Sequence, residues 1–111
     1  MSVRERRAHP RVRADLPVVA VVARSRRLAP GPRVPGRLID VSAGGLAFEP
    51  AAPLQAGDLV RIAFGGDAAA VVPEAVVVRC DSDAAGTICA CRFSELQRWL
   101  VEAVEGALQH A

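Results

Sequence analysis

The chain has 111 residues, which is enough for one small domain with a single core. It is 51% hydrophobic and 23% charged, a composition typical of a packed soluble domain and not of a disordered chain. All fourteen basic residues are arginine, and both lysine and tyrosine are absent. Schiff-base chemistry, a phosphate-loop lysine and a phenolic acid or nucleophile are therefore excluded.

The net charge of +2 is distributed unevenly along the chain. Residues 1–37 carry ten arginines and two acids, whereas residues 38–111 carry four arginines and ten acids. This segregation indicates an anionic partner for the basic half.

Membrane, export and metal signals are all missing from the sequence. No segment reaches the roughly 18 apolar residues that a membrane span needs, and residues 1–10 lack the apolar stretch of a signal peptide. We therefore expect a cytoplasmic protein. Cys80, Cys89 and Cys91 lack the spacing of a zinc site, so we expect three free thiols, no metal and no cofactor.

The first third of the chain alternates basic and apolar segments. Residues 1–15 are predicted to form a flexible basic arm, because they hold five arginines, no apolar periodicity and Pro10. Leu16–Ala23 is β-branched and too short for a helix, so it is predicted as a buried strand. Arg24–Arg37, with three prolines and two glycines, is predicted as a solvated loop of unassigned role.

The middle of the chain is predicted to add further short strands separated by turn residues. Together with the first strand they predict an all-β domain over residues 16–111, a small antiparallel barrel or sandwich of about half a dozen strands. The expected strands are Arg37–Val41, Leu46–Glu49, Leu59–Phe64, Ala70–Cys80 and Thr87–Phe93, the last two forming a hairpin.

The hydrophobic period changes in the last segment. Apolar residues recur every four positions from Leu96 to Leu108, which predicts one amphipathic helix over residues 95–109. Ser94, three residues before Gln97, has the form of a capping box. We expect the apolar face of this helix to pack on the barrel, or else on a partner.

Catalysis has few candidate residues. His9, Asp40 and Ser42 could be combined into a triad, but Ser42 lies in Asp-Val-Ser-Ala-Gly-Gly, without the pattern of a nucleophile elbow. His9 lies in the basic arm, where a general base would be poorly oriented. We therefore predict that the protein is not an enzyme.

Anion recognition is better supplied. Arg7 and Arg11 are four residues apart, and Arg6 extends the cluster. A guanidinium is planar and permanently charged, and it can donate two hydrogen bonds at once to phosphate or to the O6/N7 edge of guanine. Taken alone, however, an arginine-rich terminus is usually a solvated tail.

A second cluster follows at the end of the second predicted strand. Asp40 and Ser42 are two apart, so both side chains point to one face. A carboxylate there can accept from guanine N1–H and N2–H, and the Ser42 hydroxyl can bind a phosphate or an amino group. Gly44 and Gly45 permit positive φ and a close approach of the backbone to a ligand. The simpler interpretation is a turn with glycines closing a hairpin.

Taken together, the two clusters make the sequence resemble the PilZ domain family. Arg7–Arg11 fits the RxxxR signature of that family, with Arg6 giving the longer RRxxxR form, and Asp40–Gly45 fits its DxSxxG signature about thirty residues later. The resemblance covers nearly the whole chain. One departure is Ala90, where many members have glycine three residues before the phenylalanine that here is Phe93.

The resemblance implies a six- to seven-stranded antiparallel β-barrel that binds cyclic di-GMP, a bacterial second messenger. Arg7 and Arg11 would hold guanine edges and phosphates, Asp40 and Ser42 would complete these contacts, and Gly45 would shape the turn beneath them. Arg6 implies an intercalated pair of ligands, hence two molecules per chain. We expect a stand-alone receptor or adapter, whose response passes to an unidentified downstream protein or through oligomerisation, such as a homodimer.

Two alternatives remain open at this stage. A small barrel with a basic arm could bind RNA or single-stranded DNA, although only four aromatic residues are present to stack on bases. The chain could also be a PilZ-like protein-interaction module that never binds nucleotide.

Overall fold

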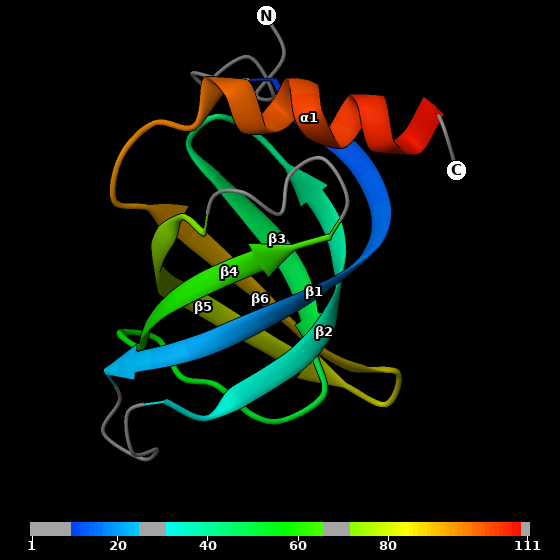
Figure 1. Ribbon diagram of the computed structural model, residues 1–111. Coiled ribbons are helices and arrows are strands. Elements are labelled where there is room, and N and C mark those ends of the chain that lie inside the picture. Colours follow the sequence, from blue (N-terminus) through cyan, green and yellow to red (C-terminus); the bar gives the residue numbers. More distant parts are fainter. Residues whose placement is uncertain (1–9, 25–30, 66–71, 110–111) are drawn as a thin grey trace, which may run out of the picture.

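The computed structural model describes residues 10–24, 31–65 and 72–109, with side chains up to residue 106. Six strands form a barrel, and one helix lies across an end of it (Figure 1). The elements in chain order are β1 (Val12–Arg24), β2 (Arg33–Val41), β3 (Gly45–Pro50), β4 (Leu59–Phe64), β5 (Glu74–Asp83), β6 (Gly86–Phe93) and α1 (Arg98–Gln109).

The strands pair in the order β1-β2-β3-β6-β5-β4, and the sheet closes because β4 pairs with β1. Every pairing in this ring is antiparallel. The predicted all-β barrel with a C-terminal helix is therefore confirmed, with six strands.

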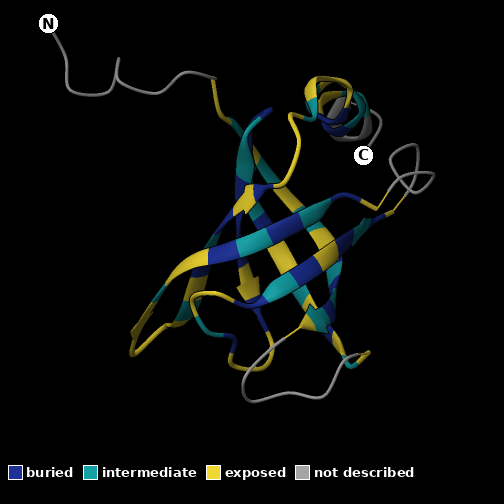
Figure 2. Cartoon of the chain, turned by 90° about the vertical axis from the view of Figure 1, so that its left-hand side faces the viewer, coloured by how far each residue is buried: buried dark blue, intermediate teal, exposed yellow. Residues whose placement is uncertain are grey.

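The core lies inside the barrel and follows from the alternation of apolar side chains. In β1, Val18, Ala20 and Val22 point inward and are almost completely buried, while the residues between them are partly exposed. Figure 2 shows the same alternation of buried and less buried residues along the other strands. Phe48 on β3 is the largest of the fully buried side chains.

An irregularity in β2 decides which residues reach the outer surface near the end of that strand. Leu38 pairs with Phe48, but Asp40 already pairs with Ala47, so β2 has one extra residue between them. This bulge shifts the alternation, so that Leu38 and Val41 are both buried in the core. Asp40 consequently lies on the outer face of the barrel.

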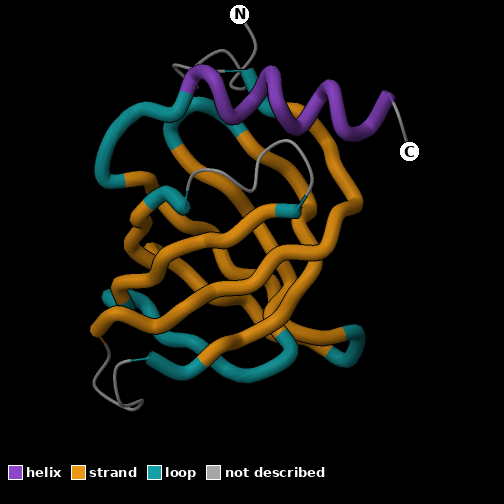
Figure 3. The backbone as a smooth tube through the Cα atoms, in the orientation of Figure 1, coloured by secondary structure: helices purple, strands orange, loops and turns teal. Residues whose placement is uncertain are grey.

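Helix α1 covers the end of the barrel, as Figure 3 shows. Leu100 and Val104 are buried and belong to the same core cluster as the strand residues. The helix begins at Arg98, three residues later than predicted. The predicted capping box is absent, because the Ser94 hydroxyl donates to a Glu74 carboxylate oxygen at 2.9 Å instead. Leu96 therefore precedes the helix and is 55% exposed.

The strands also differ from the predicted bounds. β1 begins at Val12, so residues 12–15 of the predicted arm belong to this strand. Two of them, Val12 and Arg13, pair directly with β2. β2 begins at Arg33, because Val34 adds a buried side chain to the core. Residues 1–9 of the arm and residues 25–30 of the predicted loop lie outside the described residues. Within the described ranges, no helix is long and apolar enough to cross a membrane.

Candidate functional site

The DxSxxG segment forms the tight turn between β2 and β3. The Ser42 amide donates to the Gly45 carbonyl at 2.8 Å, which closes the hairpin. The Ser42 hydroxyl lies within the same turn: it accepts from the Gly44 amide at 3.3 Å and donates to the Gly45 carbonyl at 3.4 Å. Ser42 is only 8% exposed, so in this structure its hydroxyl serves the turn.

The end of β6 and the residue before α1 hold this turn from the other side. The Phe93 amide donates to the Gly44 carbonyl at 2.9 Å, and the Gln97 amide donates to the Ala43 carbonyl at 2.8 Å. Both hydrogen bonds join the turn to the segment that leads into the helix. The turn is therefore held by β6 and by Gln97, the residue before α1, and a local motif could not reveal these contacts.

Gly45 is required for a reason other than the predicted one. Its φ lies outside the left-handed region, so the expectation of positive φ is wrong at this position. A Cβ atom at Gly45 would instead collide with the carbonyl oxygen of Cys91 on β6. The glycine is needed because β3 and β6 pass very close to one another at Gly45↔Arg92.

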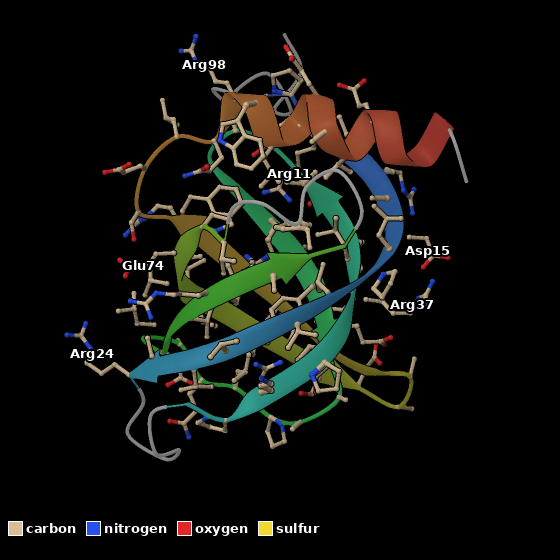
Figure 4. The ribbon with its side chains drawn as sticks, in the orientation of Figure 1. Arg11, Asp15, Arg24, Arg37, Glu74 and Arg98 are labelled. Atoms are coloured by element: carbon tan, nitrogen blue, oxygen red, sulfur yellow. The ribbon has the colours of Figure 1, made fainter. Side chains whose placement is uncertain are left out.

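The structure brings together one arginine of the RxxxR motif and the aspartate of DxSxxG. Arg11, labelled in Figure 4, donates from Nη1 to the two carboxylate oxygens of Asp40 at 3.2 and 3.5 Å. The Arg11 and Asp40 side chains are 39% and 21% exposed. Both charged groups therefore remain accessible from the solvent, and an ion pair this exposed contributes little to stability.

Two further arginines lie on the outer face of β1 and β2. Arg13 is directly opposite Asp40 in the strand register and is exposed. Arg37 forms an ion pair with Asp15, with 2.6 Å between its Nη2 and the carboxylate oxygen. Neither was among the predicted site residues. The sequence feature that could have identified Arg13 is its two-residue spacing from Arg11. This spacing places both side chains on one face only if the extended strand conformation begins near Val12.

The remaining predicted arginines, Arg6 and Arg7, lie outside the described residues. The structure therefore places five of the seven predicted site residues. Asp40, Ser42, Gly44 and Gly45 share one turn, and Arg11 joins them through Asp40.

A separate groove of about 530 Å³ lies on the barrel surface away from this turn. It is lined by the start of β2, the end of β3 and the β5–β6 turn, with Arg37 and Glu49 as its charged residues. None of the five described site residues lines it. The groove is wide open and shallow, so we place the candidate site at the charged turn, where the functional groups converge. Across the described ranges, no cluster of three or more potential metal ligands occurs.

The family model of the PilZ domain matches residues 5–106 of this chain. The chain belongs to the PilZ domain family. The match includes both arginine positions of RxxxR and the whole DxSxxG turn of this PilZ domain. No curated protein matches it in sequence.

Solved structures with the same fold include two proteins from different bacteria. The first is the inhibitor of motility (MotI/DgrA) of Bacillus subtilis, with a TM-score of 0.63 and 21% identity over 95% of this PilZ domain. The match covers 50% of the length of that protein, so this chain spans about half of it. The second is the PilZ domain of YcgR from Escherichia coli with c-di-GMP, at a TM-score of 0.63 and 18% identity, covering 95% of this chain and 90% of that one. A structure of YcgR from Escherichia coli in complex with c-di-GMP matches with a TM-score of 0.61 and 18% identity, again over 95% of this chain but 45% of that one.

Proposed function

We propose that this PilZ domain is a receptor for cyclic di-GMP and acts by binding, not by catalysis. The observation that carries the proposal is the pairing of Arg11 with Asp40, 3.2 Å apart on the outer face beside the DxSxxG turn. Membership of the PilZ family and the cyclic di-GMP complexes of YcgR support the choice of ligand.

The chemistry of the pair matches the ligand. A guanine presents N1–H and N2–H donors to a carboxylate such as Asp40, and O6 and N7 acceptors to an arginine. Arg11 uses only Nη1 for Asp40. Since a guanidinium has five N–H donors, Nε and Nη2 can still donate to a guanine edge or a phosphate. Arg11 can therefore remain paired with Asp40 while its other N–H groups bind the ligand.

The other motif residues have assigned parts in the proposal. Arg7 binds phosphate or a guanine edge from the arm, while Gly44 and Gly45 shape the turn beneath the ligand. Ser42 already uses its hydroxyl inside the turn, so it contacts a phosphate only if it gives up the long bond to Gly45. Arg6 stacks on an additional guanine, so two molecules of cyclic di-GMP bind per chain.

Calorimetric titration with cyclic di-GMP tests this proposal. Arg7→Ala and Arg11→Ala each remove a charge-assisted contact and should lower the binding free energy by about 2–4 kcal/mol, with the fold intact by circular dichroism. Arg6→Ala should reduce the stoichiometry from two ligands to one. Near wild-type affinity in both the Arg7 and the Arg11 variant would overturn the assigned site.

The matched control is Arg24→Ala, which removes the same charge from the far end of β1 and should bind normally. GTP and a short RNA are the control ligands. The alternative, a barrel that binds RNA or single-stranded DNA, predicts that RNA binds more tightly than cyclic di-GMP, with an affinity that falls steeply with salt. If the chain is a protein-interaction module that does not bind nucleotide, no heat of binding is expected with cyclic di-GMP, GTP or the short RNA.

A further inference from the structure

Two cysteines face one another across the β5–β6 hairpin. Cys80 on β5 is directly opposite Cys89 on β6 in the strand register, and their Sγ atoms are 2.7 Å apart. Directly opposite residues in an antiparallel pair have Cα atoms about 4.5 or 5.5 Å apart. Both values lie within the range of about 4.4–6.8 Å that disulfides span. The backbone therefore already has the geometry that a disulfide needs.

The two thiols differ in their access to solvent. Cys80 is only partly buried, whereas Cys89 is completely buried and touches the core. A small oxidant in solution would therefore meet Cys80 first. Cys89 is then the group that can react with an oxidised Cys80, because no other sulfur is opposite Cys80 in the register.

The third cysteine provides an internal comparison. Cys91 points into the core from the same strand as Cys89, but its register partners are Val77 on β5 and Leu46 on β3. Burial raises the pKa of Cys91 to about 12, and it also raises the pKa of Cys89. Because a raised pKa keeps both buried thiols protonated, neither reacts readily by itself. Which of them can form a disulfide therefore depends on which has a sulfur opposite it, and only Cys89 does.

We propose that Cys80 and Cys89 form a reversible intrachain disulfide when the domain meets a peroxide. The inference is independent of nucleotide binding. It assigns a modification site to two residues that the cyclic di-GMP proposal does not use.

The reaction balances with hydrogen peroxide as the oxidant. The Cys80 sulfur takes one peroxide oxygen as the O–O bond breaks, which gives a sulfenic acid, and the other oxygen leaves as water with the thiol proton. The Cys89 sulfur then attacks the Cys80 sulfur, so that the S–S bond forms and the S–O bond breaks. The departing hydroxide takes the Cys89 proton and becomes the second water. Two thiols are oxidised and one peroxide is reduced.

The Sγ atoms are 2.7 Å apart, and an S–S bond is about 2.0 Å long, so they need to approach by only about 0.7 Å. Each side chain can provide this by a small rotation, while the strands keep their register. The bridge would close the short loop of residues 81–88 and tie β5 to β6 at the point where Cys89 belongs to the core and Cys80 packs against it.

Peptide mapping of the peroxide-treated protein tests the proposal. The intact chain should lose the mass of two hydrogen atoms, and the number of alkylatable thiols after unfolding should fall from three to one. Cleavage after Arg79 and Arg92 releases one peptide with all three cysteines, and cleavage before Asp83 then separates Cys80 from the other two. The two fragments should remain joined until a reductant is added.

Single variants identify the sulfurs. Cys91→Ser should retain the bridge, whereas Cys80→Ser should abolish it; since Cys80 is only partly buried, this second variant is expected to fold. Three results would overturn the proposal: Cys80 oxidised to sulfinic acid with Cys89 still reduced, a bridge from Cys80 to Cys91, or a bridge only between two chains. Full retention of three thiols at peroxide concentrations that oxidise a free cysteine peptide would also overturn it.

Discussion

At the scale of single residues, Gly45 has little freedom to change. A methyl group there would meet the backbone carbonyl of Cys91, which cannot move without displacing β6. We expect Gly45→Ala to lower the free energy of unfolding by about 1–3 kcal/mol, the usual cost of overpacking. Urea unfolding followed by circular dichroism measures this.

Gly106→Ala is the matched control. A Cβ atom at this helical position meets nothing within 4 Å, and its φ is not in the left-handed region. Since alanine is the better helix former, this variant should gain up to about 1 kcal/mol of stability. Equal losses in both variants would show that the close approach of β3 to β6 is not what selects glycine at position 45.

At the same turn, a variant of Asp40 can test the proposed binding role and the stability of the fold separately. Its ion pair with Arg11 is exposed, so Asp40→Asn should change the free energy of unfolding by less than about 1 kcal/mol. The same variant replaces an acceptor for guanine N1–H and N2–H with an amide, and it should weaken cyclic di-GMP binding at least tenfold. Thermal unfolding without ligand and calorimetry with ligand give the two numbers. A large loss of stability would mean that Asp40 is a scaffold residue.

The sequence could place Arg11 and Asp40 in one expected site, because both belong to spaced motifs of one family, but it could not predict the direct ion pair between them. It could not predict the position of Arg13, which depends on where β1 starts to pair with β2. It also could not explain Gly45, because the colliding carbonyl belongs to a residue 46 positions further along the chain. This contact depends on the pairing of β3 with β6, two strands that are not consecutive in the chain and that no single turn joins.

At the scale of elements, helix α1 is attached to the barrel by a narrow apolar contact. Leu100 is completely buried, while Leu96, four residues earlier with the same helical spacing, is 55% exposed. Leu100→Ala should therefore cost about 2–5 kcal/mol of unfolding free energy. Leu96→Ala should cost less than about 0.5 kcal/mol, like other surface substitutions. Similar costs would mean that the segment before Arg98 also packs on the barrel.

The helix start shows why the bounds of elements are harder to predict than their type. The four-residue period correctly indicated a helix, but it extended the helix back to residue 95. In the structure the Gln97 amide donates to Ala43 and the Ser94 hydroxyl donates to Glu74. Tertiary partners therefore take the groups that would have capped the first turn.

At the scale of the whole molecule, buried thiols should make stability fall in alkaline solution. Burial raises the pKa of Cys91 from its ordinary 9.0 to about 12 and also raises that of Cys89. Between pH 9 and 12 the unfolded chain releases these protons while the folded chain retains them. The free energy of unfolding should therefore fall as pH rises, by about 1.4 kcal/mol per pH unit for each such thiol. Below pH 9 both states are protonated and this effect vanishes.

Urea unfolding in the presence of a reductant, from pH 8 to pH 11, measures the slope. The chain suits this experiment because it has no lysine or tyrosine to ionise in the same range. Cys91→Ala should reduce the slope, in addition to any constant loss from the missing side chain. An unchanged slope in this variant would show that Cys91 does not remain protonated in the folded state.

The closure of the sheet limits how any partner can attach. In the ring formed by the six described strands, each strand has a neighbour on both sides along the closed part of the barrel, where no strand edge is open to another chain. The β5–β6 hairpin extends beyond this part, and in the described pairings residues 79–83 of β5 pair only with β6. Recognition by an added β-strand, which depends on main-chain hydrogen bonds, is thereby blocked where the ring is closed. A partner that binds this closed wall must recognise side chains on its outer face. We therefore expect single substitutions of exposed side chains on the closed wall to change the binding of a partner there without disturbing the barrel.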